Sequence, residues 1–321
     1  MGRRFINELK EGDMVDDVFL LQGREVKIDR NNKSYIQAKL ADKSGTIAAK
    51  VWDVSSSQIE SFGKEGPLRV KGVVGLYNNS LQLTIKDFSR EDSYERLGEL
   101  FPCSERDVKE LKDELVEIIG TIGHPHLARL LRLFLADEEF MQRLSLSPAS
   151  VKYHHAYLGG LLEHTVSIAR LAIEAARHYR ILDRDLLLTG AILHDIGKTR
   201  ELSYKGGFQY TDEGGLVGHI VMGALMVEEK AVQIKDFPGE LLDLVKHIIL
   251  GHHGDTDPNS PRIPATAEAL AVHYLDNLDA KLQAFARAVA EDRDPHSNWT
   301  EFQKIFDSRL YKGTQKYSSS P

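Results

Sequence analysis

The segment ILHDIGK, at residues 192–198, places a histidine, an aspartate and a lysine at spacings suited to metal chemistry. His194 and Asp195 are neighbours, and neighbouring residues of a helix project about 100° apart, so the imidazole and the carboxylate can converge on one ion. Lys198 follows the acid by one helical turn, which brings its ammonium group to the same cavity. A metal ion beside a fixed cation is suited to phosphate-ester chemistry, because both stabilise negative charge on oxygen.

Further histidines and one acid stand in similar apolar, helix-like surroundings. All 13 histidines lie after residue 123, and those in such surroundings are His164, His219 and the pair His252-His253, followed by Asp276. Together with the His-Asp pair they are spaced about 24 to 33 residues apart, roughly one helix and one loop each, so each helix can supply one ligand to a shared cavity. A single histidine of this kind is more often a core or helix-end residue. The complete set favours a metal site.

Length and composition indicate a soluble protein with two domains and no disulfide. The chain has 321 residues, more than the roughly 250–300 at which a single core usually divides. No apolar run approaches the about 18 residues that span a bilayer, and the N-terminal residues lack an apolar signal core, so we expect a cytoplasmic protein with no membrane partner. Cys103 is the only cysteine. Any metal site must therefore use histidine and carboxylate ligands.

Charge is distributed unevenly along the chain. The net charge is −7, but residues 1–90 hold 15 Lys and Arg against 12 Asp and Glu, a balance of +3, which leaves −10 for the rest. A nucleic acid would thus meet a mildly basic module beside an acidic one. This asymmetry is compatible with polynucleotide binding and does not establish it.

Residues 12–90 alternate between apolar and polar side chains, as strands with one buried face do. Turn-forming residues separate the alternating segments, and a short helix fits residues 55–62. Gly72 and Gly75 indicate a bulge or a tight bend. The five expected strands cover residues 14–30, 34–42, 46–53, 67–77 and 80–88. Five strands with a helix between the third and fourth resemble an OB-fold, a barrel that binds oligonucleotides.

One face of the expected barrel carries aromatic and cationic side chains in alternation: Tyr35, Lys39, Lys50 and Trp52. Bases can stack on the rings while the ammonium groups meet phosphates, so we expect these residues to bind a single-stranded nucleic acid. The alternatives are an ordinary solvated sheet face and a face that packs on the second domain. Trp52 is the strongest candidate, because an exposed tryptophan otherwise leaves apolar area in water.

From residue 104 onward the apolar residues recur at helical spacing. Residues 91–103 are expected to form a linker, and 199–215 and 254–264 to form loops, the first with a short hairpin as the alternative. The end of the chain, 313–321, is expected to be a disordered tail. The expected helices lie near residues 104–120, 126–135, 137–144, 156–179, 184–197, 216–230, 239–250 and 264–290.

The order H…HD…H…HH…D of the candidate ligands resembles the HD-domain metal phosphohydrolases over residues 150–290. Within that group, the segments GGLLEHT, ILHDIGK, YTDEGGLVGHI and GHHG resemble the YhaM-type 3′–5′ exoribonucleases, which place an OB-fold domain before the HD domain. The resemblance implies an α+β multidomain protein, with a five-stranded OB-fold β-barrel followed by an all-α HD-domain helical bundle. The expected parts are a nucleic-acid-binding domain at 1–90, a linker at 91–103, a phosphohydrolase domain at 104–312 and a tail at 313–321.

The resemblance also implies roles for the candidate residues. His164, His194, Asp195 and Asp276 would hold one ion, and Asp195 would bridge to a second ion held by His219, His252 and His253. Imidazole and carboxylate ligands suit several metals, and we expect Mn²⁺, with Co²⁺, Fe²⁺, Ni²⁺ or Zn²⁺ as alternatives. Two ions about 3.5–4 Å apart can activate water and stabilise both the attacking and the leaving oxygen. The expected catalytic residues are Asp195, Lys198 and His194.

Two positions stay open. Asp279 lies one turn after Asp276 and competes with it as a ligand, although the order D-N-L-D-A favours Asp276 by family resemblance. His154 and His155 precede the first ligand helix and either contact a substrate phosphate or cap that helix. We place His155 and Lys198 among the expected substrate-binding residues.

Three functions fit these features. The leading one is a metal-dependent 3′–5′ exoribonuclease that converts single-stranded RNA, and as a further candidate single-stranded DNA, to nucleoside 5′-monophosphates. The second is an HD phosphodiesterase acting on nucleotides or cyclic dinucleotides, which has no need of the aromatic barrel face. The third is a non-catalytic protein that binds single-stranded nucleic acid, which leaves the complete ligand set without a purpose. The oligomeric state stays open, a homo-oligomer included.

Overall fold

The computed structural model describes residues 3–91, 97–151, 155–254, 260–292 and 294–313. His154, all but the first residue of the expected tail, and parts of the expected linker and of the 254–264 loop lie outside these ranges. The chain forms two compact units, one made of the residues up to Glu105 together with Leu202–Thr211, the other of the remainder. The expected domain division had placed Leu202–Thr211 in the helical part. Within the first unit, Gln209 donates a hydrogen bond to Glu65 (2.8 Å) and the Phe208 ring lies 5.4 Å from that of Phe101.

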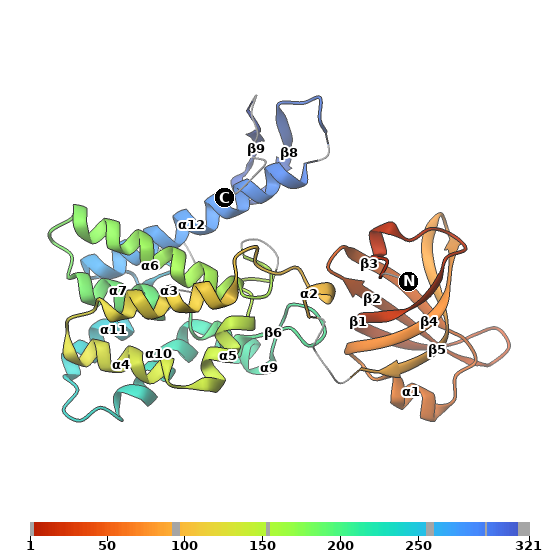
Figure 1. The fold of residues 1–321 in the computed structure, drawn as a ribbon, viewed down its shortest axis with the longest axis horizontal. Helices are drawn as coiled ribbons and strands as arrows, with labels where there is room; N and C mark the ends of the chain where they lie inside the picture. Colours follow the sequence, from red (N-terminus) through yellow and green to blue (C-terminus); the bar gives the residue numbers. More distant parts are fainter. Residues whose placement is uncertain (1–2, 92–96, 152–154, 255–259, 293, 314–321) are drawn as a thin grey trace. The chain divides into compact units, whose positions relative to one another are not determined.

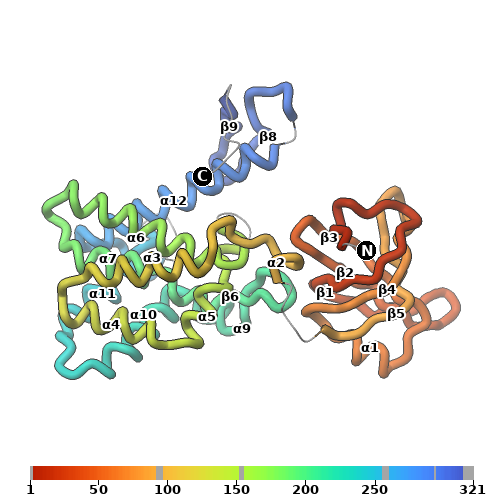
Figure 2. The backbone as a smooth tube through the Cα atoms, viewed as in Figure 1, coloured from red at the N-terminus to blue at the C-terminus, as the bar shows by residue number. Residues whose placement is uncertain are grey.

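Five strands of the first unit close into a barrel in the order β1-β2-β3-β5-β4 (Figures 1 and 2). Neighbours are antiparallel except for the parallel pair β3 and β5. Helix α1, Ser56–Phe62, connects β3 to β4, and the Ser55 side chain caps it by accepting a hydrogen bond from the Gln58 N–H. The strands are β1 Met14–Ile28, β2 Ser34–Asp42, β3 Gly45–Val51, β4 Gly66–Tyr77 and β5 Ser80–Arg90. This arrangement confirms the predicted OB-fold.

The alternating pattern sets the faces of the strands. On β2, Ile36 and Leu40 are fully buried, while Lys39 is exposed. A bulge shifts the register between β4 and β5 at Lys71 and Gly72, where Lys86 of β5 is the extra residue. A Cβ at Gly72 would lie 2.4 Å from the Thr84 carbonyl oxygen, so glycine is required there, as predicted. No such irregularity occurs at Gly75, which has open space beside it.

The second unit is helical and packs around one continuous hydrophobic core. At its centre, α7 is buried at every position from Leu186 to Leu193, so its neighbours must cover it on all sides. Among the described helices, none is both long and apolar enough to cross a bilayer. The helices are α3 Val108–Gly120, α4 Pro125–Leu135, α5 Glu138–Leu146, α6 Gly160–His178, α7 Arg184–Leu193, α8 Lys198–Glu201, α9 Asp212–Val217, α10 His219–Ala231, α11 Gly239–Gly251 and α12 Ala267–Glu291.

Several short elements were not anticipated. A turn of helix, α2 at Leu97–Leu100, lies in the expected linker, and α8 and α9 lie in the expected 199–215 loop, whose predicted hairpin is β6 with β7 (Leu202–Ser203 and Gln209–Tyr210). The part expected to be all-α also ends in an antiparallel hairpin of β8 Trp299–Gln303 and β9 Ser308–Tyr311, turned by Asp307 at φ +48°. Pieces this short leave no periodic signal, because two to six residues do not complete a recognisable pattern.

Candidate metal centre

The candidate ligands come from five different helices of the second unit and meet in one buried cluster. His164, His194 and His252 are fully buried, and Asp195 is 1% exposed. The residues stand at the following places: His164 within α6, His194 at the C-cap of α7 with Asp195 directly after it, His219 as the first residue of α10, His252 at the C-cap of α11 with His253 next, and Asp276 within α12.

The His-Asp pair lies in a turn and not, as expected, within a helix, because α7 ends at Leu193. His194 nevertheless keeps helical backbone angles (φ −56°, ψ −37°), so the expected projection of the pair is retained. The turn passes close to α10: a Cβ at Gly197 would lie 1.9 Å from the His219 carbonyl oxygen. Glycine at this position therefore lets the pair approach the next ligand helix.

One group of ligand atoms gathers around Asp195 Oδ2. The His194 Nε2 lies 3.4 Å and the His164 Nε2 3.6 Å from that oxygen. The two imidazole nitrogens are 3.3 Å apart, and Asp276 Oδ1 lies 3.2 Å from His164 Nε2. Three side chains that no local sequence segment joins thus converge on one point, as the ligands of a metal ion do.

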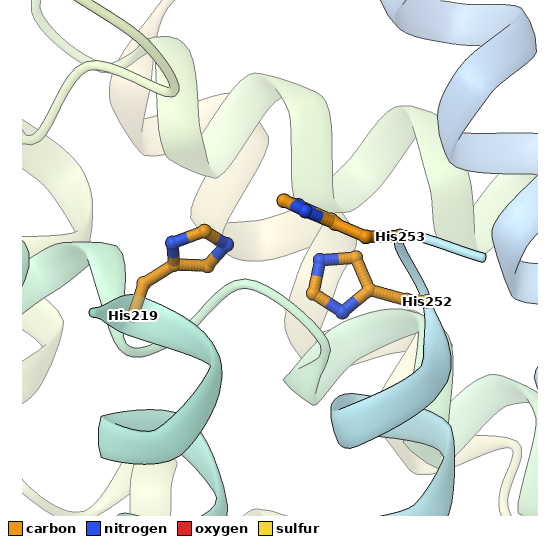
Figure 3. A group of neighbouring side chains, drawn as sticks. All are labelled: His219, His252 and His253. Atoms are coloured by element: carbon orange, nitrogen blue, oxygen red, sulfur yellow. The ribbon is translucent and has the colours of Figure 1, made fainter. Parts of the chain in front are cut away.

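A second group gathers around the other oxygen of Asp195. The Nε2 atoms of His219 and His252 each lie 3.5 Å from Asp195 Oδ1. The His253 ring completes this group, with ring centroids 5.2 Å from His219 and 4.4 Å from His252 (Figure 3). The nitrogens of these three rings come close enough together to hold a single ion.

Four of the histidines use Nδ1 inside the protein and present Nε2 to the centre. His194 and His252 each donate from Nδ1 to a backbone carbonyl three residues earlier, those of Ala191 and Ile249. The other two pair Nδ1 with carboxylates, His164 with Asp279 (2.8 Å) and His219 with Glu201 (2.9 Å). Such partners orient metal-ligating histidines and set which nitrogen is free to bind.

Unsatisfied buried atoms are a second observation that fits a divalent metal ion. Among the described side chains, the buried atoms Asp195 Oδ1, His219 Nε2 and His252 Nε2 make no hydrogen bond. Buried polar atoms are normally satisfied, and three that face one another call for a partner that accepts lone pairs from all of them. A divalent cation is such a partner.

The electrostatics match this assignment at Asp195, His252 and His253. Burial acts to raise the pKa of Asp195, but Lys198 and His194 outweigh it and hold that pKa well below its usual range. Burial acts against the protonated form of His164, but its hydrogen bonds to Asp276 and Asp279 raise the pKa to about 9. Burial lowers the pKa values of His252 and His253. Asp195 therefore stays ionised and His252 and His253 stay neutral, which are the forms that bind metals, whereas His164 is protonated and would release its proton on binding an ion.

Asp279 lies on the Nδ1 side of His164, whereas Asp276 lies on the Nε2 side that faces the cluster, and Asp279 forms a further group with His155 and His164 whose ligand atoms also come close together. Its Oδ2 accepts hydrogen bonds from His164 Nδ1 and from His155 Nε2 (3.0 Å), and its Oδ1 accepts one from Ser167 (2.5 Å). His155, expected to contact the substrate, is 3% exposed, and its Nδ1 is 2.6 Å from the Tyr157 hydroxyl. Both of its ring nitrogens are engaged within the protein, one of them with Asp279.

Lys198 reaches the cluster as expected. Its Nζ lies 2.6 Å from Asp195 Oδ2, and its side chain is 12% exposed. Burial acts to lower the pKa of Lys198, but Asp195 and Asp276 raise it, so the ammonium group keeps its charge.

The sequence reasoning missed Glu201, which fixes His219; an acid one turn after Lys198 was the available signal.

On the barrel, the predicted aromatic face forms a cavity of about 450 Å³, here called the Trp52 cavity. The rings of Tyr35 and Trp52 lie 4.8 Å apart, and Trp52 is 48% exposed. The Lys50 Nζ lies 5.1 Å from the Trp52 ring and 4.5 Å from that of Tyr77, which the sequence reasoning missed. Lys39 points outward from the same strand as Tyr35 but does not line this cavity.

A helical bundle whose buried His-Asp pair meets ligands from four further helices defines an HD-domain protein with a divalent-metal centre. The family model described as HD domain matches residues 161–281. The 3′-5′ exoribonuclease YhaM of Bacillus subtilis (strain 168) is 34% identical over 310 residues, which cover 94% of this chain and 96% of that protein. The YhaM of Geobacillus sp. (strain WCH70) is 34% identical over 282 residues, covering 87% and 86%. The chain belongs to the family of the YhaM 3′–5′ exoribonucleases.

Among solved structures, the second OB-fold domain of replication protein A from Methanococcus maripaludis is similar to part of the chain, with 14% identity and a TM-score of 0.23. The match covers 28% of this chain and 95% of that one.

Proposed function

We propose that this protein is a metal-dependent 3′–5′ exoribonuclease that releases nucleoside 5′-monophosphates from single-stranded RNA. The observation that carries the proposal is the position of Asp195, whose two carboxylate oxygens face two separate groups of imidazole nitrogens. A carboxylate so placed is suited to bridge two divalent ions. The relatives named 3′-5′ exoribonuclease YhaM, matched over nearly the whole chain, support the activity and its direction.

We propose two ions, with Mn²⁺ as the physiological metal and Co²⁺, Fe²⁺, Ni²⁺ or Zn²⁺ as substitutes. His164, His194 and Asp276 would hold one with Asp195 Oδ2, while the three histidines of Figure 3 would hold the other. Ligands that are mainly imidazole suit all of these metals, so the protein alone selects weakly among them. Divalent ions in such a site act as Lewis acids toward the phosphodiester and make water a better nucleophile.

The chain's own residues do the positioning. Asp279 and Glu201 hold the imidazoles of His164 and His219 in the orientation that presents Nε2. Lys198 keeps its charge beside Asp195, where the negative charge of a phosphoryl group would grow during displacement. Such a fixed cation stabilises the transition state more than the substrate, because the charge it opposes develops only there.

The Trp52 cavity is the proposed binding site for the strand. Tyr35, Trp52 and Tyr77 offer rings for stacking around the Lys50 ammonium group, a combination that accepts any base. Lys39 is proposed to meet phosphates further along the same face. Single-stranded DNA is a second candidate substrate, because stacking does not depend on the ribose 2′-hydroxyl.

The test uses 5′-labelled single-stranded RNA and Mn²⁺ with the wild type, His194→Ala and His178→Ala. His178 is an exposed histidine at the end of α6, which makes it a matched control. Stepwise shortening from the 3′ end by the wild type and the control, absent in His194→Ala, supports the proposal. Intact RNA with hydrolysis of a cyclic dinucleotide would assign the second function, and binding without cleavage by all three proteins would assign the third.

A further inference from the structure

A second cavity lies on the outer surface of the barrel, and the proposed function makes no use of it. It measures about 400 Å³ and is here called the Arg3 cavity. Its charged lining residues are four cations and two acids, Arg3, Arg4, Lys71, Lys86, Asp16 and Asp17. Three of these cations are ion-paired, Arg3 with Asp17 and Glu99, Arg4 with Asp13, and Lys71 with Asp16, so the case for an anionic ligand rests on the remaining donors of Arg3 and on Lys86.

Arg3 is the buried part of this site. Its side chain is 6% exposed, and Nη1 donates to Glu99 Oε2 at 3.0 Å. The guanidinium group also lies over the ring of Phe5, 5.3 Å from the centroid, which fixes its position. Among the described residues, however, Nε and Nη2 have no hydrogen-bond partner. These two nitrogens carry three unsatisfied N–H groups, which call for acceptors such as the oxygens of a phosphate. Because both nitrogens are buried, a phosphate would reach them after a shift of the Arg3 side chain.

The two lysines of the cavity are exposed and stand on adjacent strands. Lys71 lies on β4, 3.5 Å from Asp16, and Lys86 lies on β5. None of the ion pairs in the described chain uses Lys86. The cavity therefore offers at least one ammonium group whose charge no neighbouring carboxylate neutralises.

The Arg3 cavity adjoins the Trp52 cavity along the same two strands. On β5, Thr84 lines the Trp52 cavity and Lys86 lines the Arg3 cavity. On β4, Gly75 lines the Trp52 cavity and Val73 lines the Arg3 cavity. Residues two apart in a regular strand point to the same face and are about 7 Å apart, which applies to Val73 and Gly75. Lys86 is the bulged residue of β5, two positions after Thr84. A chain molecule whose bases lie in the Trp52 cavity can therefore reach the Arg3 cavity.

From these observations we propose that the Arg3 cavity binds a backbone phosphate of the same single strand whose bases stack in the Trp52 cavity. The inference rests on the proposed function and extends the binding face further along β4 and β5. Its ligand chemistry is a phosphate anion, for which a free nucleotide or inorganic phosphate is the other source.

The test measures RNA affinity by fluorescence anisotropy in EDTA, so that no cleavage occurs. It compares the wild type with Lys71→Ala/Lys86→Ala and with Lys64→Ala, an exposed lysine that lines neither cavity. Two oligonucleotides are used, of about 12 and about 4 nucleotides, within the range of OB-fold site sizes. The double variant should bind the longer RNA about tenfold more weakly and lose about 0.7 from the salt slope, the value for one phosphate contact on a single strand. Its affinity for the shorter RNA should change less than twofold.

Arg3→Ala gives a second reading, with thermal unfolding measured alongside because Arg3 is buried. It should also weaken binding of the longer RNA selectively. Unchanged affinity of the double variant for the longer RNA, or equal losses for both lengths, would overturn the inference. Calorimetric binding of AMP or inorganic phosphate that the double variant loses while RNA affinity is unchanged would assign the cavity to a free phosphate. A wild type that binds neither RNA would count against the proposed function itself, whereas one that binds and degrades RNA leaves that function intact whatever the variants do.

Discussion

Four histidines of the metal centre each have a hydrogen bond that orients the imidazole ring. For His194 and His252 the geometry of a helix end is enough. His194 and His252 stand at helix C-caps, where the carbonyls of the last turn have no helical N–H partner. Each imidazole donates Nδ1–H to one of these carbonyls, three residues earlier, and so turns Nε2 toward the centre. The dipeptides His194-Asp195 and His252-His253 therefore place ligands at helix ends for a physical reason.

Asp195→Asn tests the bridging role. Because each carboxylate oxygen faces one ligand group, we expect loss of both metal ions and a fall in activity of at least about 100-fold. Metal content after dialysis against trace Mn²⁺ measures the loss of metal, and RNA turnover measures the fall in activity. Retention of one full equivalent of metal would contradict a bridge. Circular dichroism checks the fold, because the variant also leaves Lys198 without its partner.

Asp279→Asn separates positioning from ligation. The variant keeps the size of the side chain but weakens the hold on His164 and His155, so we expect about 10- to 100-fold weaker Mn²⁺ affinity. Excess Mn²⁺ should restore turnover of Asp279→Asn, whereas it should not restore turnover of Asp195→Asn, which lacks the proposed bridging ligand. Calorimetric titration of Mn²⁺ measures the affinity, with Glu291→Gln on the same helix as the control. An unchanged affinity would show that Asp279 has no part in metal binding.

At the scale of elements, close approach is what brings the ligand helices together. Gly190 on α7 lies against Ile248 on α11, where a Cβ would be 2.6 Å from the isoleucine side chain, and Gly197 lies against the first turn of α10. These contacts leave no room for a larger residue between α7, which carries the His-Asp pair, and the helices that carry the facing histidines. The small residue in ILHDIGK is thus a packing requirement of the site.

Gly197→Ala should push the turn after α7 away from α10. The clash is with backbone, which cannot move aside as a flexible side chain can, so we expect a loss of about 1–3 kcal/mol in the free energy of unfolding and weaker metal binding. Gly239→Ala, in the first turn of α11 with open space beside it, should be neutral or stabilise by up to about 1 kcal/mol. Denaturant unfolding measures both variants, and equal stabilities would refute the packing argument.

At the scale of the whole molecule, the proposed ions would tie five helices of the second unit and none of the barrel. The two tryptophans report on the units separately, since Trp52 lies in the barrel unit and Trp299 in the helical unit. The metal effect on stability can therefore be assigned to a unit by fluorescence.

Removal of metal should destabilise the helical unit alone. An ion at 100 times its dissociation constant adds about 2.7 kcal/mol to folding stability. In Trp52→Phe, where Trp299 is the reporter, EDTA should lower the unfolding midpoint by several degrees. In Trp299→Phe, where Trp52 reports, the midpoint should not move. An equal shift of both midpoints would show that the ions do not act on the helical unit alone.

Strong periodic signals made most of the fold predictable. The five strands of the barrel and the long helices were expected from alternation and helical spacing, because burial of one face repeats along the chain. The missed elements, such as α2 and the β8–β9 hairpin, are short and follow local turns. Tyr77 and Arg3 escaped notice for another reason: each becomes a neighbour of its cavity only when strands distant in sequence close the barrel.

The sequence by itself determined which residue types could bind metal, their order along the chain and the two kinds of fold that carry them, since these follow from composition and spacing. Only the tertiary structure decided which atoms meet. It placed Asp276 on the Nε2 side of His164 and Asp279 on the Nδ1 side, buried His155 against Asp279, and turned the two oxygens of Asp195 toward different histidines. Helix packing sets these choices, because spacing along a chain fixes the face of one helix but not the point where five helices converge.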